Sequence, residues 1–174
     1  PMICTEAGWH SNNYAQFPST PEVQSRYVVQ LFAQSLASRL DAMIWWTWID
    51  PGAGYGDNGL LTQALQRKPA FEAYRVAAEK LGRGSFQRRL SAQELGHPSL
   101  EGYQFKNRSG LPLYVLWSND EGITQTVSLP LPSAQVIDMY GNLLGVQSDS
   151  EDGRIDGSIQ VNVGANPIYV EARP

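Results

Sequence analysis

Cysteine, histidine and charge are all scarce in this sequence. Its 174 residues include one cysteine and two histidines, and 17% of them are charged, giving a formal net charge of −4. A single cysteine, Cys4, excludes an intrachain disulfide, and its place in an apolar run is typical of a buried, inert thiol. His10 and His97 are far apart and have no neighbouring ligand pattern, so no metal site is predicted.

Basic patches and long apolar runs are also missing. The mildly acidic balance provides no electrostatic footprint for nucleic acid or an anionic membrane. No apolar run approaches the roughly 20 residues needed to span a bilayer. The glycine-rich segment 51–59 lacks the spacing of a phosphate-binding loop. We therefore predict no nucleic-acid partner, no membrane partner and no cofactor, and the compartment stays open between secretion and a bacterial cytoplasm.

Tryptophan, in contrast, is abundant and unevenly placed. Four of the five tryptophans lie in the first third of the chain: Trp9, Trp45, Trp46 and Trp48. Side chains alternate along a strand, so Trp46 and Trp48 share one face of the apolar segment 42–50 and Trp45 takes the other. We expect Trp46 or Trp48 to serve as a stacking platform for a ligand, and Trp45 to pack under a helix.

Residues 1–81 show a strand-then-helix pattern twice. Apolar strands are predicted at 1–7 and 42–50, and amphipathic helices at 20–40, after the capping-box spacing Ser19-Thr20-Pro21-Glu22, and at 69–81. Buried strands alternating with helices indicate a parallel sheet or barrel, in which functional groups gather where the strands end. Glu6 ends the first strand beside Gly8, which suits nucleophilic or acid/base work on a sugar. By position alone, a loop-capping or arginine-paired carboxylate is an equal alternative, and the tryptophan-rich strand favours the sugar site.

The second half of the chain changes character. Short alternating segments separated by turn residues predict a small antiparallel β-sandwich over 100–174. Residues 83–99 are polar without a sustained period and are interpreted as a linker, which leaves an α/β domain at 1–82. The acidic stretch 149–156 departs from the spacing of a calcium loop, and Asp152-Gly153 is predicted to form a hairpin turn instead. The candidate strands are 103–106, 113–117, 124–127, 135–139, 158–163 and 168–171.

Several segments together resemble a known group of enzymes. Thr5-Glu6-Ala7-Gly8-Trp9 resembles the seventh strand of the large (β/α)₈-barrel clan of retaining glycoside hydrolases, which includes β-xylosidases, α-iduronidases and cellulases. The segment 44–50, Ile-Trp-Trp-Thr-Trp-Ile-Asp, resembles the eighth strand, and 68–74 resembles the start of the eighth helix. Residues 138–142 and 167–171 resemble the β-sandwich that often follows in the clan. The fold class this implies is α/β plus all-β, with the last two βα units of a TIM barrel followed by a small antiparallel β-sandwich.

The resemblance implies roles for individual residues. Glu6 would be the nucleophile, and Trp9, Trp46, Trp48 and Asp50 would line the sugar subsite. The acid/base glutamate of the clan ends the fourth barrel strand, and no Asn-Glu pair occurs in this sequence. We therefore expect the C-terminal part of a glycosidase that acts on a carbohydrate substrate but is not active alone.

Two further expectations follow from a partial barrel. Its open strand edges and apolar faces need cover, which predicts self-association or a complementary fragment carrying the earlier barrel strands. The alternative to a glycosidase is a non-catalytic carbohydrate-binding or structural module that uses only the aromatic residues and the sandwich.

Overall fold

The computed structural model describes residues 1–14, 16–53, 55–152 and 155–173. The chain divides into two compact units, Pro1–Glu79 and Lys80–Pro174. The domain boundaries drawn from the sequence stay a prediction, and the hairpin turn expected at Asp152-Gly153 lies outside the described residues because Gly153 is not among them. None of the described helices is long and apolar enough to cross a membrane.

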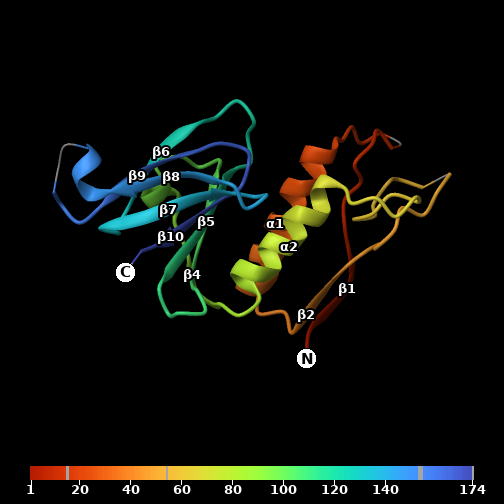
Figure 1. Cartoon of the computed structure of the whole chain (residues 1–174), viewed down its shortest axis with the longest axis horizontal. Helices are drawn as coiled ribbons and strands as arrows, with labels where there is room; N and C mark the ends of the chain where they lie inside the picture. The colour runs from red at the N-terminus through yellow and green to blue at the C-terminus, as the bar shows by residue number, and fades with distance from the viewer. Residues whose placement is uncertain (15, 54, 153–154, 174) are drawn as a thin grey trace. The chain divides into compact units, whose positions relative to one another are not determined.

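The first unit has two parallel strands and two helices. Strand β1 pairs with β2 in parallel, with Ile3 opposite Ala42 and Ala7 opposite Trp45, as the strand-helix pattern predicts. Figure 1 shows α1 and α2 on the same side of this strand pair. The elements are β1 (Ile3–Ala7), α1 (Pro21–Ala37), β2 (Ala42–Trp45) and α2 (Pro69–Leu81).

Helix α1 begins one residue later than its capping-box spacing indicates. Thr20 is the N-cap, and its hydroxyl accepts a hydrogen bond from the Val23 N–H at 3.2 Å. The Ser19 hydroxyl instead donates to the His10 carbonyl at 2.6 Å, so this side chain fastens the preceding loop. At the other end, Arg39 has a φ of 55°, which closes the helix before the predicted end at residue 40.

The strand pair leaves apolar side chains in solvent, which differs from the buried strands expected from the sequence. Ile3 is 51% exposed and Ile44 is 53% exposed. Strands of parallel sheets normally have both faces covered. Here the sheet has only two strands among the described residues. The apolar composition of β1 and β2 therefore exceeds what this unit buries.

The second unit contains two antiparallel sheets that share one core. Six strands follow the order β3-β4-β5-β10-β7-β8, and a smaller sheet pairs β6 with β9. Fully buried Leu116 and Val170 from the large sheet join Val127 and Val163 from the small one in a single apolar cluster. The strands are β3 (Ser85–Arg89), β4 (Leu100–Lys106), β5 (Pro112–Ser118), β6 (Gln125–Leu129), β7 (Ser133–Asp138), β8 (Leu143–Ser148), β9 (Ile159–Val163) and β10 (Ile168–Ala172).

Residues 83–99 are more regular than the linker expected from the sequence. They contain β3, which pairs with β4 at the edge of the large sheet, and the short helix α3 (Ala92–Leu95). Ser91 and Glu94 form a complete capping box at the start of this helix. Strand β3 is mostly solvent-exposed, so its sequence lacks the alternation by which a half-buried strand is found.

Candidate functional site

The carboxyl ends of β1 and β2 lie against each other. The Trp46 N–H donates to the Ala7 carbonyl at 2.8 Å, which continues the pairing just beyond β2. A Cβ at Gly8 would overlap the Trp46 carbonyl oxygen, so only glycine allows this close approach. The segments that follow the two strands therefore begin side by side.

Glu6 lies at this end of β1 and is exposed. The pairing register shifts between Cys4 and Ala7, so Glu6 occupies an irregular part of the strand. Its carboxylate makes no hydrogen bond or ion pair with any of the residues that the structure describes. The loop-capping and arginine-paired alternatives considered from the sequence are thus not what the described residues show.

The tryptophans of the second strand segment have separate environments. Trp45 is 8% exposed, which confirms that it is buried, and its indole N–H donates to the Asn58 carbonyl at 3.0 Å. The expectation that it packs under a helix stays a prediction. Trp46 is 40% exposed. Trp48 is half-exposed, with one edge against Phe71 of α2 at a ring-centroid distance of 5.7 Å. The peptide bond between Trp46 and Thr47 is cis.

Trp9, expected in the sugar subsite, packs on α1. Its ring stacks on Tyr27 with centroids 4.4 Å apart and planes inclined by 9°, and it also stacks on His10 at 5.1 Å. The indole nitrogen is buried without a hydrogen-bond partner among the described residues. The structure thus places Trp9 beneath the loop rather than on an open surface.

Asp50, also expected to bind substrate, belongs to a buried polar network. Its carboxylate pairs with Lys68 at 2.9 Å, and both side chains are less than a tenth exposed. The same oxygen accepts from the Gly59 N–H at 2.8 Å, and the Lys68 ammonium donates to the Asp57 carbonyl at 2.8 Å. These bonds fix the glycine-rich loop 51–59 to the start of α2.

A fully buried glutamine joins this loop to the one after β1. The Gln24 side-chain NH₂ group on α1 donates to the carbonyls of Trp9 at 2.9 Å and of Asp57 and Gly59 at 3.2 Å. The Ser11 N–H also donates to the Asp57 carbonyl, at 3.0 Å. Sequence reasoning missed Gln24, although a polar residue four positions before Val28 on the buried stripe of an amphipathic helix is a usable signal.

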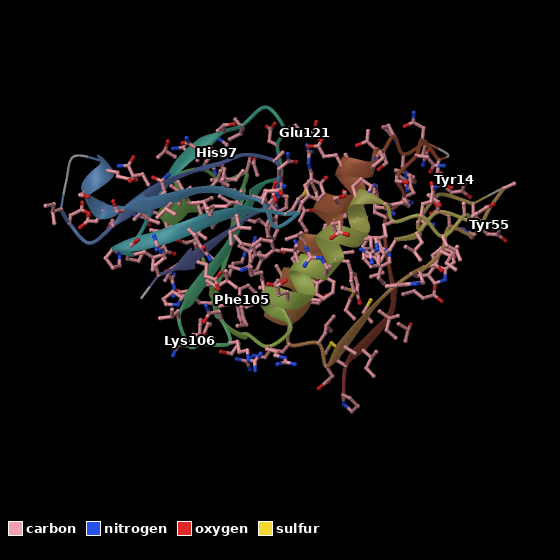
Figure 2. The ribbon with its side chains drawn as sticks, viewed as in Figure 1. Tyr14, Tyr55, His97, Phe105, Lys106 and Glu121 are labelled. Carbon is pink, nitrogen blue, oxygen red and sulfur yellow. The ribbon has the colours of Figure 1, made fainter. Side chains whose placement is uncertain are left out.

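Exposed aromatic residues on the two loops were missed as well. Tyr14 follows β1 and Tyr55 follows β2, and Figure 2 shows both at the end of the unit that carries these loops. Tyr55 is 61% exposed, and a Cβ on its neighbour Gly56 would come within 3.3 Å of the Tyr14 ring. Tyr14, Tyr55 and Trp46 thus expose flat apolar rings on the segments that follow the two strands, and such rings suit stacking on a sugar.

No cofactor or metal position emerges at this site. Among the described residues, no group of three or more His, Cys, Asp or Glu side chains is arranged to hold a metal ion. The chemistry available within the first unit is that of a carboxylate, aromatic rings and backbone amides.

Comparison with known proteins gives structural neighbours only. No protein-family model matches the chain, and no curated protein sequence matches it significantly. Its fold is similar to part of a family 39 glycoside hydrolase from the gut symbiont Bacteroides cellulosilyticus WH2, with a TM-score of 0.75, 20% identity and 98% of this chain covered. The catalytic domain of GH30 xylanase C from Talaromyces cellulolyticus has a TM-score of 0.62 at 16% identity, again over 98% of this chain.

Both neighbours are glycoside hydrolases, and both are much longer than this chain. The matched region covers 33% of the family 39 enzyme and 40% of the xylanase domain. At these identities the likeness establishes a fold, a mixed α/β unit followed by antiparallel sheets. It does not by itself assign a role to any residue.

Proposed function

We propose that this chain is the C-terminal part of a retaining glycoside hydrolase of the (β/α)₈-barrel clan that includes β-xylosidases, α-iduronidases and cellulases. In this proposal β1 and β2 are the last two barrel strands, and the second unit is the trailing β-sandwich. The observation that carries it is the arrangement at the strand ends, where Glu6 is the last but one residue of β1 and Trp46 directly follows the adjacent parallel strand β2. The structural likeness to two glycoside hydrolases over nearly the whole chain supports it.

Glu6 has the part of the nucleophile. One of its carboxylate oxygens attacks the anomeric carbon, and the bond to the glycosidic oxygen breaks with its electron pair on that oxygen. A glycosyl ester results, which water then hydrolyses with net retention of configuration. An exposed carboxylate at a strand end, without a hydrogen-bond partner among the described residues, is suited to this attack.

Retention also needs a second carboxyl group, about 5–5.5 Å from the first, to protonate the leaving group. Three of the other acids of the first unit are already engaged in other contacts. Asp50 pairs with buried Lys68, Asp41 accepts from the Met2 N–H, and Glu72 pairs with Arg75 on α2. We therefore assign the acid/base to residues outside this sequence, and expect the chain by itself to leave ordinary glycosides uncleaved.

The sugar subsite rests on Trp46, with Trp48, Tyr14 and Tyr55 around it. Trp46 and Trp48 are both partly exposed at the strand ends, and stacking on a pyranose uses such flat apolar faces. Asp50 and Trp9, expected from the sequence to touch substrate, take supporting roles in this proposal. They hold the loops that carry the exposed rings.

The proposal also explains why one face of the β1-β2 strand pair is uncovered. Exposed Ile3 and Ile44 would be buried by further βα units, because parallel strands are covered on both faces in barrels. We propose that a segment or fragment with the remaining strands covers this face, and self-association of the chain is the alternative.

A leaving group that needs no proton tests the proposal with the chain as it is. We would incubate the chain with 2,4-dinitrophenyl glycosides of several pyranoses in the presence of azide. Glu6 should displace dinitrophenolate unaided, and azide should then attack the anomeric carbon and release Glu6, giving a glycosyl azide of retained configuration. Glu6→Gln should abolish this product, and Glu22→Gln, an acid exposed on α1, should not.

The outcomes separate the proposal from its alternative. Binding of sugars that depends on Trp46, with no glycosyl azide from any donor, would favour the non-catalytic binding module. Rapid cleavage of unactivated glycosides that is lost in Glu6→Gln would show that the acid/base lies within this chain and refute its assignment elsewhere.

A further inference from the structure

A groove in the second unit lies apart from the strand-end site. The small β6-β9 sheet covers only part of the large sheet, and a cavity of about 500 Å³ opens between β9 and the edge strand β8. Small-molecule sites in proteins occupy roughly 300–1,000 Å³, so this groove can hold a few sugar-sized rings. All of its lining residues belong to the second unit.

Small residues in the large sheet make room for the groove. Strand β8 pairs with β7 so that Gly145 lies opposite Val136, and Gln147 lies opposite the fully buried Ala134. Neither Gly145 nor Ala134 fills the space above the sheet. Val136 and Val161, both less than a tenth exposed, give the groove an apolar floor.

Polar side chains form the walls of the groove in the part of the chain that the structure describes. The amides of Gln147, Gln160 and Asn162 and the hydroxyl of Thr126 line it, and neither lysine nor arginine is among the described lining residues. Glu151 is the only carboxylate among these described residues. This lining suits a neutral ligand better than a phosphate or a uronic acid, which the carboxylate would repel.

The amides differ in how far they are already engaged. Thr126 donates its hydroxyl to the Asn162 side-chain oxygen at 2.9 Å, which fixes the orientation of that amide on the wall. The side-chain amide of Gln147 makes no hydrogen bond with any residue that the structure describes, although it is half-buried. An amide offers both a donor and an acceptor, the pair that vicinal hydroxyl groups require.

We infer that this groove is a second, non-catalytic binding site for a neutral oligosaccharide. Sugar hydroxyls would pair with Gln147, Gln160 and Asn162, and an apolar ring face would lie over Val136 and Val161. The site stands on its own lining residues and does not depend on the strand-end proposal. With no aromatic ring in the groove, it gives weak binding that would position a polymer rather than capture a single sugar.

The chain titrated with xylohexaose, cellohexaose and the anionic hexagalacturonate, followed by amide chemical shifts, tests the inference. A neutral hexasaccharide should shift β8 and β9 amides, and Gln147→Ala and Asn162→Ala should each weaken its binding at least fivefold. Gln87→Ala, which removes an exposed glutamine bonded only within β3, should leave binding unchanged. Trp46→Ala should also leave these β8 and β9 shifts in place.

Three results would overturn the inference. One is the absence of shifts in β8 and β9 with both neutral sugars. Another is equal binding of hexagalacturonate, and the third is loss of binding in Trp46→Ala with retention in Gln147→Ala. Should a groove variant lower the melting temperature, the location of the wild-type shifts decides the matter alone.

Discussion

The two units of this protein order their backbones by different means. In the second unit, side chains from two sheets bury each other, and Leu116, Val127 and Val163 are at most about 1% exposed. In the first unit, Ile3 and Ile44 of the central strands are half in solvent. The loops of that unit are held instead by buried polar groups, above all Asp50 and Lys68.

The difference fits two different tasks: the second unit is stabilised by an apolar core, and the first unit holds the loops of the proposed site. An apolar core stabilises a unit without regard to direction, whereas hydrogen bonds place particular backbone groups at particular points. The loops after β1 and β2 need placement because they carry the exposed rings and follow Glu6. The buried network is thus a positioning device for the proposed subsite.

The largest expected effect concerns the polar network. Lys68→Met should lower the free energy of unfolding by about 3–5 kcal/mol, because it leaves the Asp50 carboxylate buried without its partner. Urea unfolding monitored by tryptophan fluorescence measures this. Arg75→Met breaks exposed ion pairs on α2, which solvent screens, and should have a far smaller effect. If both variants lowered the free energy of unfolding equally, the buried Asp50–Lys68 pair would not stabilise the first unit more than an exposed pair does.

A core substitution gives the corresponding test for the second unit. Leu116→Ala should cost about 2–5 kcal/mol, because it opens a cavity among fully buried neighbours. Ile3→Ala, on the exposed face of β1, should cost much less. If thermal unfolding showed Ile3→Ala to be as damaging as Leu116→Ala, the first unit would bury its strands in solution, through self-association for example.

Gln24 should matter more for the order of the loops than for overall stability. Gln24→Leu removes the amide that donates to three carbonyls, at an expected cost of about 1–3 kcal/mol. The carbonyls of Trp9 and Gly59 lose this donor, whereas that of Asp57 keeps Ser11 and Lys68. Hydrogen exchange should become faster in the loops after β1 and β2. Gln30→Leu on the same helix is the matched control. Unchanged exchange at Ser11 in Gln24→Leu would contradict the positioning role.

The smallest effect lies in the capping box of α3. Hydrogen bonds from the Ser91 N–H, then from the Arg88 side chain and the Ser91 hydroxyl, lower the pKa of Glu94 from 4.5 to about 2. A lowered pKa stabilises the fold at a pH above 4.5, and this contribution is lost as the pH falls from 4.5 towards 2.

Ser91→Ala removes the hydroxyl but keeps the backbone N–H of residue 91, so the pKa of Glu94 should rise only part of the way towards its ordinary value. Loss of the N-cap should cost about 1 kcal/mol at neutral pH. Carbon-13 titration of the Glu94 carboxyl, together with unfolding at pH 7 and pH 3, would check both effects. A pKa that stays near 2 in this variant would assign the shift to the backbone N–H and Arg88, without a contribution from the hydroxyl.

Helices and strands that bury apolar side chains could be predicted from the sequence, because burial leaves a regular apolar pattern. The apolar spacing in α1 and α2, the alternation in β9 and the continuous apolar run of β5 follow directly from how those elements pack. Strand β3 and strand β8 were not found, because both are sheet edges with little buried surface. An exposed edge has no reason to alternate.

The site could be predicted in part for the same reason. Alternation correctly separated buried Trp45 from exposed Trp46. It could not reveal that Trp9 stacks on Tyr27, or that Lys68 lies 2.9 Å from Asp50, since these partners are distant in sequence and meet only in the fold. A carboxylate at a strand end looks the same in sequence whether it is exposed, as Glu6 is, or buried in an ion pair.

The role of Glu6 can be tested most directly by trapping its ester. The chain would be treated with 2,4-dinitrophenyl 2-deoxy-2-fluoroglycosides, whose fluorine slows turnover of the ester while the leaving group departs without a proton. Peptide mass spectrometry should find one fluoroglycosyl group on the peptide containing Glu6, and none in Glu6→Gln. A label on another carboxylate, such as Asp57, with Glu6 unmodified would contradict the assignment of Glu6 as the nucleophile.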